Sequence, residues 1–494
     1  MPITLSRYGA LILLGALSVV LFAPFRQGYL APCLLAAVLL LLPRHNAAQA
    51  GRGIYLWALS AYCANFYWIY HSLHDIAGLP AVFAIPLVAL LPAWLALFPA
   101  AALYFTYRLS WRNPYWQWLL AFPSLWTFFD WMRGWLLTGF SWGGLGYSQI
   151  PNWPLAGLAP LFGIYAVTWA VVASAGALVL LWCFPKHRQW LGLGLAVAWV
   201  GSWGLSHIQW TEASGKPLSI SLVQGNIPQT LKWEPTIFAQ TLDTYTQHMT
   251  ASQAKLVILP ETALPIFYDE LPANYLQPLQ AILQQQEKEV ITGIPLRDMS
   301  GDYNGVISLT QPTQQYRKAH LVPFGEYVPL PWLTGWLYRY MNMPLSGFTR
   351  GEPEQQPFTV ADQRIAFNIC YEDSFGEELL AGARSATLLA NVSNLAWFGH
   401  STAAEQHLQL SQARALETGR PMLRATNTGL TAVIDQRGQV LQSLPQFHNA
   451  RLDTSVQGRQ GETPYLRWGN WPVLIALLLA IVLSFSYRRP SDHR

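Results

Sequence analysis

Long stretches of this chain contain almost no charged residues, and this feature constrains the fold more than any other. Only 11% of the 494 residues are charged and 52% are hydrophobic, whereas about 25% of the residues of an ordinary soluble protein are charged. A bilayer core of about 30 Å is crossed by roughly 20 apolar residues in a helix. The sequence therefore predicts a polytopic α-helical membrane domain.

Eight segments are predicted to be transmembrane helices. They lie near residues 8–25, 28–43, 54–74, 80–106, 115–138, 161–184, 190–207 and 470–487. The basic residues of the short flanking loops fall mostly on one side, which the positive-inside rule assigns to the cytoplasm. We therefore expect both termini to be cytoplasmic. Asp130 and Arg133, inside the fifth span, are expected to pair, because charges within a membrane rarely stay unpaired.

Charges return between the seventh and eighth spans, and short apolar runs alternate there with helical patterns. The predicted strands are PLSISLVQGNI, KLVILPE, EVITGIP, NGVISL, RIAFNIC and TLLANVS. The predicted helices cover 234–252, 272–288, 374–384 and 403–419. Alternating strands and helices are typical of an α/β domain.

Three parts are therefore predicted along the chain. Residues 1–207 are expected to hold transmembrane helices 1–7. Residues 208–468 are expected to form an outer, periplasmic catalytic domain, and 469–494 to form helix 8 with a cytoplasmic tail. At about 260 residues, the outer domain is long enough to bury a core of its own.

Cys370 is the only cysteine of the predicted outer domain. The other cysteines lie in the predicted spans, at Cys33, Cys63 and Cys183. RIAFNIC reads as a strand and SFGEELLAGA as a helix, so Cys370 is expected at a tight strand-to-helix turn, with Asp373 or Ser374 as the N-cap. A helix N-terminus stabilises a thiolate, and such turns expose nucleophiles. Cys370 is a candidate nucleophile, with a buried structural cysteine as the alternative.

A thiolate nucleophile requires a base and a group that stabilises the anionic intermediate. In KLVILPETALP, Glu261 follows a predicted strand, and in QQYRKAHLVPFGEYVP a loop carries Lys318 and Glu326. Taken singly, each is more often a surface charge. Because strand ends gather at one edge of an α/β sheet, we expect these side chains to converge with Cys370 there.

LPETALP, YRKAHLVPFGEYVP and NICYEDSFGE, in that order, resemble the nitrilase (carbon–nitrogen hydrolase) superfamily with its Glu-Lys-Cys triad. Membrane spans on both sides narrow the resemblance to the apolipoprotein N-acyltransferase family. SWGGLGYSQ, VSNLAWFG and QHLQLSQARALETGRPMLRATNTGLTAVID also agree with that family, so the resemblance covers the whole chain. It implies an α-β-β-α sandwich in the outer domain. Leu395 stands where relatives often carry an aspartate.

The resemblance implies an acyltransferase of lipoprotein maturation. Such an enzyme moves a fatty acyl chain from a membrane phospholipid, through a thioester on Cys370, to the α-amino group of the N-terminal diacylglyceryl-cysteine of an apolipoprotein. Glu261 would act as the base and Lys318 would bind the oxyanion. Glu326 would orient Lys318 or Glu261, and Glu372 would brace the turn of Cys370.

Aromatic residues are candidates for contact with lipid. The apolar stretch PLPWLTGWLYRYMNMPLSGF, residues 329–348, lies inside the outer domain and suits a membrane–water interface. We interpret it as an arm or lid that dips into the outer leaflet, with a buried core helix as the alternative. The candidates for the acyl or head-group pocket and the lid are Tyr371, Trp397, Trp332, Trp336 and Tyr338.

Two other functions remain open from the sequence. One is a membrane-anchored, nitrilase-type amidase that hydrolyses a C–N bond, although a small soluble substrate would require neither the lid nor the spans. The other is a transporter with a non-catalytic outer domain, which should show paired ionisable residues at mid-membrane. We expect a monomer in the bacterial inner membrane, with phospholipid and apolipoprotein as partners and with no cofactor, no metal and no nucleic acid.

Overall fold

The computed structural model describes residues 5–43, 46–109, 113–336 and 347–486. The chain divides into two compact units. The first unit is made of Met1–Tyr67, Val82–Gln209 and Arg467–Arg494. The second unit is made of Trp68–Ala81 and Trp210–Leu466, so a short segment from early in the chain belongs with the later domain.

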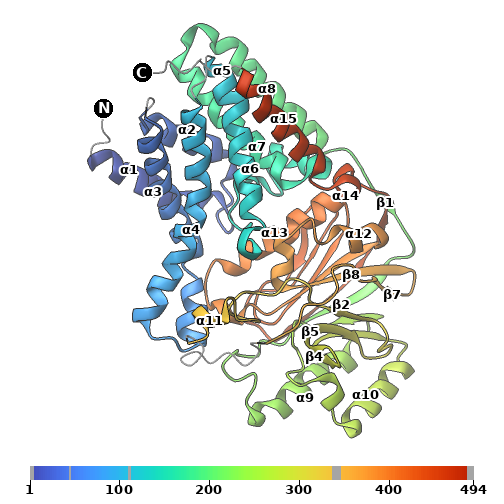
Figure 1. Ribbon diagram of the computed structural model, residues 1–494. Coiled ribbons are helices and arrows are strands. Elements are labelled where there is room, and N and C mark those ends of the chain that lie inside the picture. The colour runs from blue at the N-terminus through green and yellow to red at the C-terminus, as the bar shows by residue number, and fades with distance from the viewer. Residues whose placement is uncertain (1–4, 44–45, 110–112, 337–346, 487–494) are drawn as a thin grey trace. The chain divides into compact units, whose positions relative to one another are not determined.

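The first unit is helical because its sequence consists of apolar runs rich in Leu, Ala and Val. Its α-helices are α1 Leu5–Leu17, α2 Ala31–Leu41, α3 Ala47–Phe66, α4 Ala81–Arg108, α5 Pro114–Trp116, α6 Phe122–Arg133, α7 Ala159–Cys183, α8 Arg188–Leu205 and α15 Trp471–Ser486. α1 packs against α3, and α7 packs against both α2 and α6. Figure 1 labels these helices.

Two helices in the described part of the chain are long and apolar enough to cross a membrane, judged by length and composition. They are Ala81–Arg108 and Pro154–Cys183, and shorter apolar helices lie at Leu5–Leu21, Gly28–Leu41 and Trp471–Ser484. The predicted third span ran from 54 to 74, whereas α3 begins at Ala47 and ends at Phe66. The arrangement of eight spans stays a prediction.

The predicted pairing of Asp130 with Arg133 is confirmed. Both residues lie on α6, and Arg133 Nη2 donates to Asp130 Oδ1 at 2.7 Å. Arg133 also donates to the backbone carbonyls of Phe140, Ser141 and Trp142. This buried guanidinium therefore holds the non-helical segment that follows α6 against the helix.

Within its described residues, the second unit contains two six-stranded sheets and a small two-stranded one. The strands are β1 Glu212–Ala213, β2 Leu218–Gln224, β3 Leu256–Ile258, β4 Glu289–Asp298, β5 Gly301–Ser308, β6 Gln315–Arg317, β7 Phe358–Val360, β8 Gln363–Ile369, β9 Leu388–Ser393, β10 Met422–Thr426, β11 Ala432–Ile434, β12 Val440–Ser443, β13 Ala450–Val456 and β14 Arg459–Gln460. One sheet has the order β13-β2-β3-β4-β5-β6 and the other β12-β11-β10-β9-β8-β7. β2, β3 and β4 run parallel, as do β8, β9 and β10.

The apolar residues of alternate strand positions build a four-layer α-β-β-α sandwich. Ile220 and Leu222 of β2 point to the same face of their strand, and they form one buried cluster with Ile365 and Phe367 of β8, between the two sheets. Helices α9 Pro235–Ala251 and α10 Ala273–Gln285 cover the outer face of the first sheet. Helices α12 Leu380–Ser385 and α13 Ala403–Thr418 cover the other sheet (Figure 1).

The six predicted strands are confirmed, and so are the helices predicted at 234–252, 272–288 and 403–419. The helix predicted at 374–384 is wrong in its first half. A short 3₁₀ helix, η11, covers Cys370–Ser374, and α12 begins only at Leu380. The sequence also did not predict that Trp68–Ala81 belongs to the second unit. In this segment, a π-helix, η3, covers His71–Ile76.

Candidate active site

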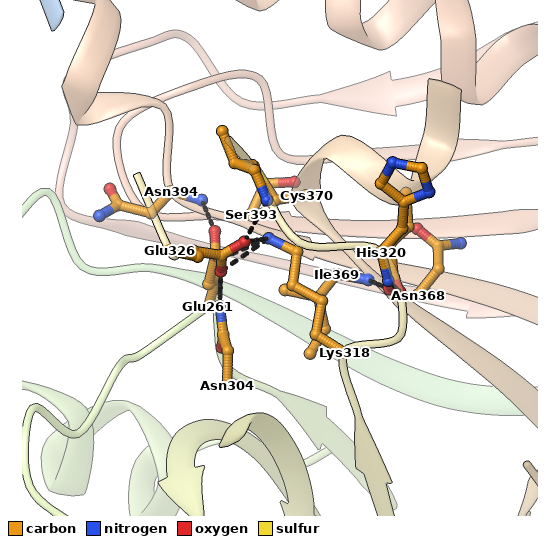
Figure 2. Close-up of polar contacts among 12 residues, drawn as sticks. Glu261, Asn304, Lys318, His320, Glu326, Asn368, Ile369, Cys370, Ser393 and Asn394 are labelled. Atoms are coloured by element: carbon orange, nitrogen blue, oxygen red, sulfur yellow. Dashed lines mark hydrogen bonds and ion pairs between the residues drawn. The ribbon is translucent and has the colours of Figure 1, made fainter. Parts of the chain in front are cut away.

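Three strand ends bring the predicted catalytic side chains together (Figure 2). Glu261 lies just after β3, Lys318 directly after β6, and Cys370 directly after β8. We expected these ends at the edge of one sheet. Instead, β3 and β6 belong to one sheet and β8 belongs to the other, so the site lies where the ends of two facing sheets meet.

The carboxylate of Glu261 is buried and is held by two donors. Asn304 Nδ2 donates to Oε1 at 2.8 Å, and the backbone N–H of Asn394 donates to Oε2 at 2.8 Å. The ammonium group of Lys318 lies 3.6 Å from Oε1. The side chain of Glu261 is therefore fixed from several directions before any substrate binds.

Lys318 contacts two carboxylates (Figure 2), and Glu326 is the closer of the two. The Nζ atom of Lys318 lies 2.9 Å from the Glu326 carboxylate, which also accepts from the N–H of Val322 at 2.8 Å. Asn304 Nδ2 donates to Glu326 at 2.7 Å as well as to Glu261. One amide group therefore joins the two carboxylates, and Lys318 supplies the positive charge between them.

Lys318 remains charged in this environment. Burial acts to lower its pKa, but the neighbouring carboxylates of Glu326 and Glu261 outweigh burial and hold the pKa above its ordinary value. A second buried lysine, Lys232, donates from Nζ to the backbone carbonyl of Glu261 at 3.2 Å. Burial lowers the pKa of Lys232 to about 8, although the charge of Glu261 acts in the opposite direction.

Cys370 occupies a strained backbone position with φ of 54°, which non-glycine residues seldom adopt. Burial raises the pKa of its thiol, and the charge of Glu261 raises it further, whereas Lys318 and the N–H of Asn394 act to lower it. The expected stabilisation of a thiolate by a helix N-terminus is therefore wrong. Only η11, a 3₁₀ helix of five residues, directly follows Cys370, so the longer helix on which that expectation depended does not begin there.

Glu372 forms hydrogen bonds on both sides of the turn of Cys370. Its carboxylate accepts from the N–H groups of Ile369 at 2.6 Å and Ala319 at 2.8 Å, and from the Tyr316 hydroxyl at 3.0 Å. The acceptor therefore connects the elbow of Cys370 to the strand end that carries Lys318. Burial raises the pKa of Glu372 to about 7, although Lys318 and the backbone donors act to lower it.

The predicted N-cap roles of Asp373 and Ser374 are wrong. The first turn of η11 is capped by Glu372, which accepts from the N–H of Ile369. The Asp373 side chain is fully buried and instead bonds Ser411 of α13 and Arg424 of β10. Because these partners are distant in sequence, the local pattern around Cys370 could not show them.

The aromatic candidates differ in their surroundings. Tyr371 is half-buried and meets His320 and Phe375 edge-on, and Trp397 is half-buried in η12 Leu395–Phe398. Trp332 and Trp336 have exposed fractions of 81% and 50%. Of the predicted lid, α11 covers Pro331–Thr334, and Tyr338 lies outside the described residues.

Leu395 is buried, and its side chain fills the space in front of Gly429, where an added Cβ would lie 2.5 Å from a Leu395 methyl group. No role was predicted for three other residues around the triad, Asn304, Asn394 and His407. The signal available for Asn304 was an amide at the first position of the predicted strand NGVISL. The other two lie in VSNLAWFG and QHLQLSQAR, stretches that agreed with a family without assigning a role to either residue.

Two family profiles match the chain. One is described as the apolipoprotein N-acyltransferase N-terminal domain and matches residues 14–177. The other is described as carbon-nitrogen hydrolase and matches residues 219–465. The second match covers the sandwich unit and includes all three candidate catalytic residues.

Curated relatives match over nearly the whole chain. The apolipoprotein N-acyltransferase of Chromobacterium violaceum is 50% identical, covering 98% of this chain and 95% of the relative. That of Nitrosomonas europaea is 44% identical, covering 98% of each. Among solved structures, a CN-hydrolase superfamily protein from Xanthomonas campestris is 21% identical, covers 53% of this chain and 97% of its own, and has a TM-score of 0.38.

Proposed function

Because the chain belongs to the apolipoprotein N-acyltransferase family, we propose that it transfers a fatty acyl chain from a membrane phospholipid to the α-amino group of a diacylglyceryl-cysteine at the N-terminus of an apolipoprotein. Cys370 is the nucleophile, Glu261 the base and Lys318 the oxyanion donor. The observation that carries this assignment is the contact of Lys318 with both Glu326 and Glu261 at the strained turn of Cys370.

In the first step, Glu261 takes the proton from the Cys370 thiol as sulfur attacks the ester carbonyl. Because burial keeps the pKa of the thiol high, the sulfur stays protonated until the base acts. The hydrogen bonds from Asn304 and Asn394 hold the Glu261 carboxylate during this transfer. A positioned base is therefore more important here than a preformed thiolate.

Lys318 then stabilises the negative charge that develops on the carbonyl oxygen. An ammonium group carries three N–H donors, and its bonds to Glu326 fix its position and keep it charged. A fixed donor in a buried site requires little reorganisation during the reaction, which is why such donors contribute strongly to rate. Collapse of the intermediate breaks the C–O bond, and Glu261 returns its proton to the leaving lysophospholipid.

The second half of the reaction uses the same groups. The free α-amine attacks the thioester carbonyl, Lys318 again binds the oxyanion, and Glu261 accepts a proton from the nitrogen. The C–S bond then breaks and the proton returns to the sulfur, which restores the enzyme. Water must be kept from the thioester during this interval, because hydrolysis would release a free fatty acid.

The location that we propose follows from the charge pattern and from exposed apolar side chains. Eight spans would place both termini in the cytoplasm and residues 208–468 in the periplasm of a cell with two membranes. Exposed rows of apolar side chains on α8 and α15 support this location, because a bilayer would cover them. They are Trp190, Leu193, Val197 and Val200 on α8 and Leu478, Leu479, Val482 and Leu483 on α15.

The exposed indole rings of Trp332 and Trp336 are proposed to enter the outer leaflet, where both lipid substrates lie. They would form the membrane-facing part of the proposed lid, whereas Tyr338 lies outside the described residues. Trp397 and Tyr371 would line the pocket closer to Cys370. In this arrangement, substrates reach the site directly from the bilayer.

The test of the proposed function is detection of the acyl-enzyme. Purified protein is incubated with a phospholipid but without an acceptor, and its intact mass is measured. We expect an increase of one acyl group that hydroxylamine removes, that Cys370→Ala abolishes and that the control Cys63→Ala retains. Turnover without such an adduct would exclude Cys370 as the acyl carrier.

Adding a diacylglyceryl-peptide to the acylated enzyme distinguishes transfer from hydrolysis. Mass spectrometry should find the acyl group on the peptide amine, with little free fatty acid. If the acyl group is released only as free acid, the enzyme is a hydrolase and the proposed acyl transfer is wrong.

A further inference from the structure

A chain of buried polar side chains runs from α13 and β10 to the backbone of Cys370. His407 Nε2 lies 3.0 Å from the carbonyl oxygen of Cys370, and its other ring nitrogen, Nδ1, lies 2.8 Å from Arg424 Nη2. Arg424 in turn contacts Asp373 Oδ2 at 3.2 Å. His407, Arg424 and Asp373 are each at most 1% exposed, so the chain is shielded from solvent.

These contacts determine where the proton of His407 lies. A guanidinium group can only donate, so Nδ1 of His407 must accept from Arg424. The remaining ring proton is then on Nε2, which donates to the carbonyl of Cys370. Burial, together with the charge of Arg424, holds the pKa of His407 well below its usual range, which keeps the ring in this neutral form.

Arg424 also anchors a second donor to the same carbonyl. Its Nη1 donates to Asn391 Oδ1 at 3.1 Å, and Asn391 Nδ2 donates to the Cys370 oxygen at 3.2 Å. The carbonyl of the nucleophile therefore receives two side-chain hydrogen bonds, and one guanidinium holds both of the donors. Neither donor comes from the triad or from the contacts of Glu372.

The backbone at Cys370 requires such restraint. Cys370 has a φ of 54°, and a non-glycine residue keeps a sparsely populated conformation only when the surrounding structure imposes it. The two donors hold the Cys370–Tyr371 peptide and so restrain the backbone that follows the nucleophile. Without them, the turn as a whole could relax toward an ordinary conformation, and the sulfur would move with it.

We propose that His407 is a positioning residue for the acyl transfer, and that its Nε2–H fixes the Cys370 carbonyl so that the sulfur is held in the geometry that attacks the ester. This inference rests on the proposed function, because it assigns the support of the same nucleophile. It predicts a loss in the rate of acylation with little change in the binding of phospholipid.

The experiment compares three substitutions of His407 in the full-length protein. A glutamine amide can place its nitrogen near the position of Nε2, whereas asparagine is one bond shorter and methionine has no donor. Gln412→Met is the matched control, because Gln412 lies on the same helix and also donates from a buried side chain to a backbone carbonyl, that of Gly438 at 2.7 Å. Rates of acyl-enzyme formation are measured over a range of phospholipid concentrations.

We expect His407→Met and His407→Asn to slow acylation by about 10²-fold at saturating phospholipid, because small misplacements of a reacting group cost this much, with an unchanged half-saturating concentration. His407→Gln should stay within about tenfold of wild type, and Gln412→Met should acylate at the wild-type rate even if its Tm falls. The asparagine and glutamine variants decide the question if the methionine variant does not fold.

Two results would overturn the inference. The first is that folded His407→Met or His407→Asn acylates as fast as Gln412→Met. The second is that His407→Gln acylates as slowly as His407→Asn, because the hydrogen-bond donor would then not determine the rate. If wild-type protein forms no acyl-enzyme at all, the proposed function fails instead, and the two failures are distinguished by that single measurement.

Discussion

The ammonium nitrogen of Lys318 lies 2.9 Å from Glu326 but 3.6 Å from Glu261. The lysine therefore forms its tighter ion pair with the carboxylate that is not the base. Glu326 therefore fixes the ammonium group through a carboxylate that the proposed mechanism does not use for proton transfer.

Glu326→Gln should therefore slow acylation by about 10² to 10³, the range found when a single oxyanion donor is lost. Without the Glu326 charge, burial lowers the pKa of Lys318, so the alkaline limb of the pH–rate profile should move to lower pH. Rates of acyl-enzyme formation measured from neutral to alkaline pH report both effects. The control is Glu378→Gln, an exposed carboxylate that pairs with His320; equal rates in the two variants would contradict this account.

Asn304 gives a second prediction, because its amide nitrogen serves both carboxylates. Asn304→Ala removes the shared donor, whereas Asn304→Asp also places a third carboxyl group beside Glu261 and Glu326. Like charges at this distance cannot all ionise, so the aspartate variant should acylate at least about tenfold more slowly than the alanine variant at about pH 8. Part of that difference should disappear at mildly acidic pH, and a difference independent of pH would refute the electrostatic explanation.

Gly293 of β4 tests the backbone support of the base. An added Cβ would lie 2.4 Å from the carbonyl oxygen of Pro260 and 2.7 Å from Cα of Glu261, and neither backbone atom can easily move away. Gly293→Ala should therefore reduce stability by about 2 kcal/mol and slow acylation. The control is Gly382→Ala, whose Cβ would approach only the Ala366 methyl group at 3.3 Å. Both variants are compared in thermal unfolding and acylation assays. Similar losses in the two would contradict the proposed support of Glu261 by Gly293.

Glu372 predicts a dependence of stability on pH. Its pKa is raised in the folded protein to about 7, above the ordinary value of about 4.3, so the folded state binds the extra proton between these values. The stabilisation is complete below about pH 4 and is lost as the pH rises through about 7, and it amounts to on the order of 3 kcal/mol. The Tm advantage of wild type over Glu372→Gln in detergent should be larger at about pH 5 than at about pH 8, whereas parallel Tm curves would mean that Glu372 does not titrate in this range.

Local sequence patterns were sufficient to predict the strand ends that carry Glu261 and Cys370, because a short apolar run that stops at turn residues defines each of them directly. The pairing of Asp130 with Arg133 was predictable for a different reason, because charged residues inside a predicted membrane span rarely stay unpaired. The distribution of the catalytic residues over two sheets was not predictable, because strand order is set by packing between segments that are far apart in sequence.

The pKa of the Cys370 thiol shows the same limit. Its position before a predicted helix suggested a stabilised thiolate, but the side chain packs against a core built from both sheets, and burial raises the pKa of the thiol. Only a five-residue 3₁₀ helix follows it. The support from His407 and Asn304 was hidden similarly, because their partners lie 37 and 43 residues away in the chain. Tertiary contacts of this kind leave no periodic signal.

The segment Trp68–Ala81 is synthesised long before the rest of the unit to which it belongs. Trp68 meets the ring of Phe398 at 4.7 Å and donates from Nε1 to Gln406 at 3.2 Å, so these contacts form only after the ribosome has produced α13. A gene fragment that begins at residue 208 would encode a catalytic unit in which Phe398 and Gln406 lack their contacts with Trp68. The catalytic unit therefore depends on a segment encoded far upstream of the rest of it. A gene split between the two would yield a complete unit only if both products assembled in the same cell.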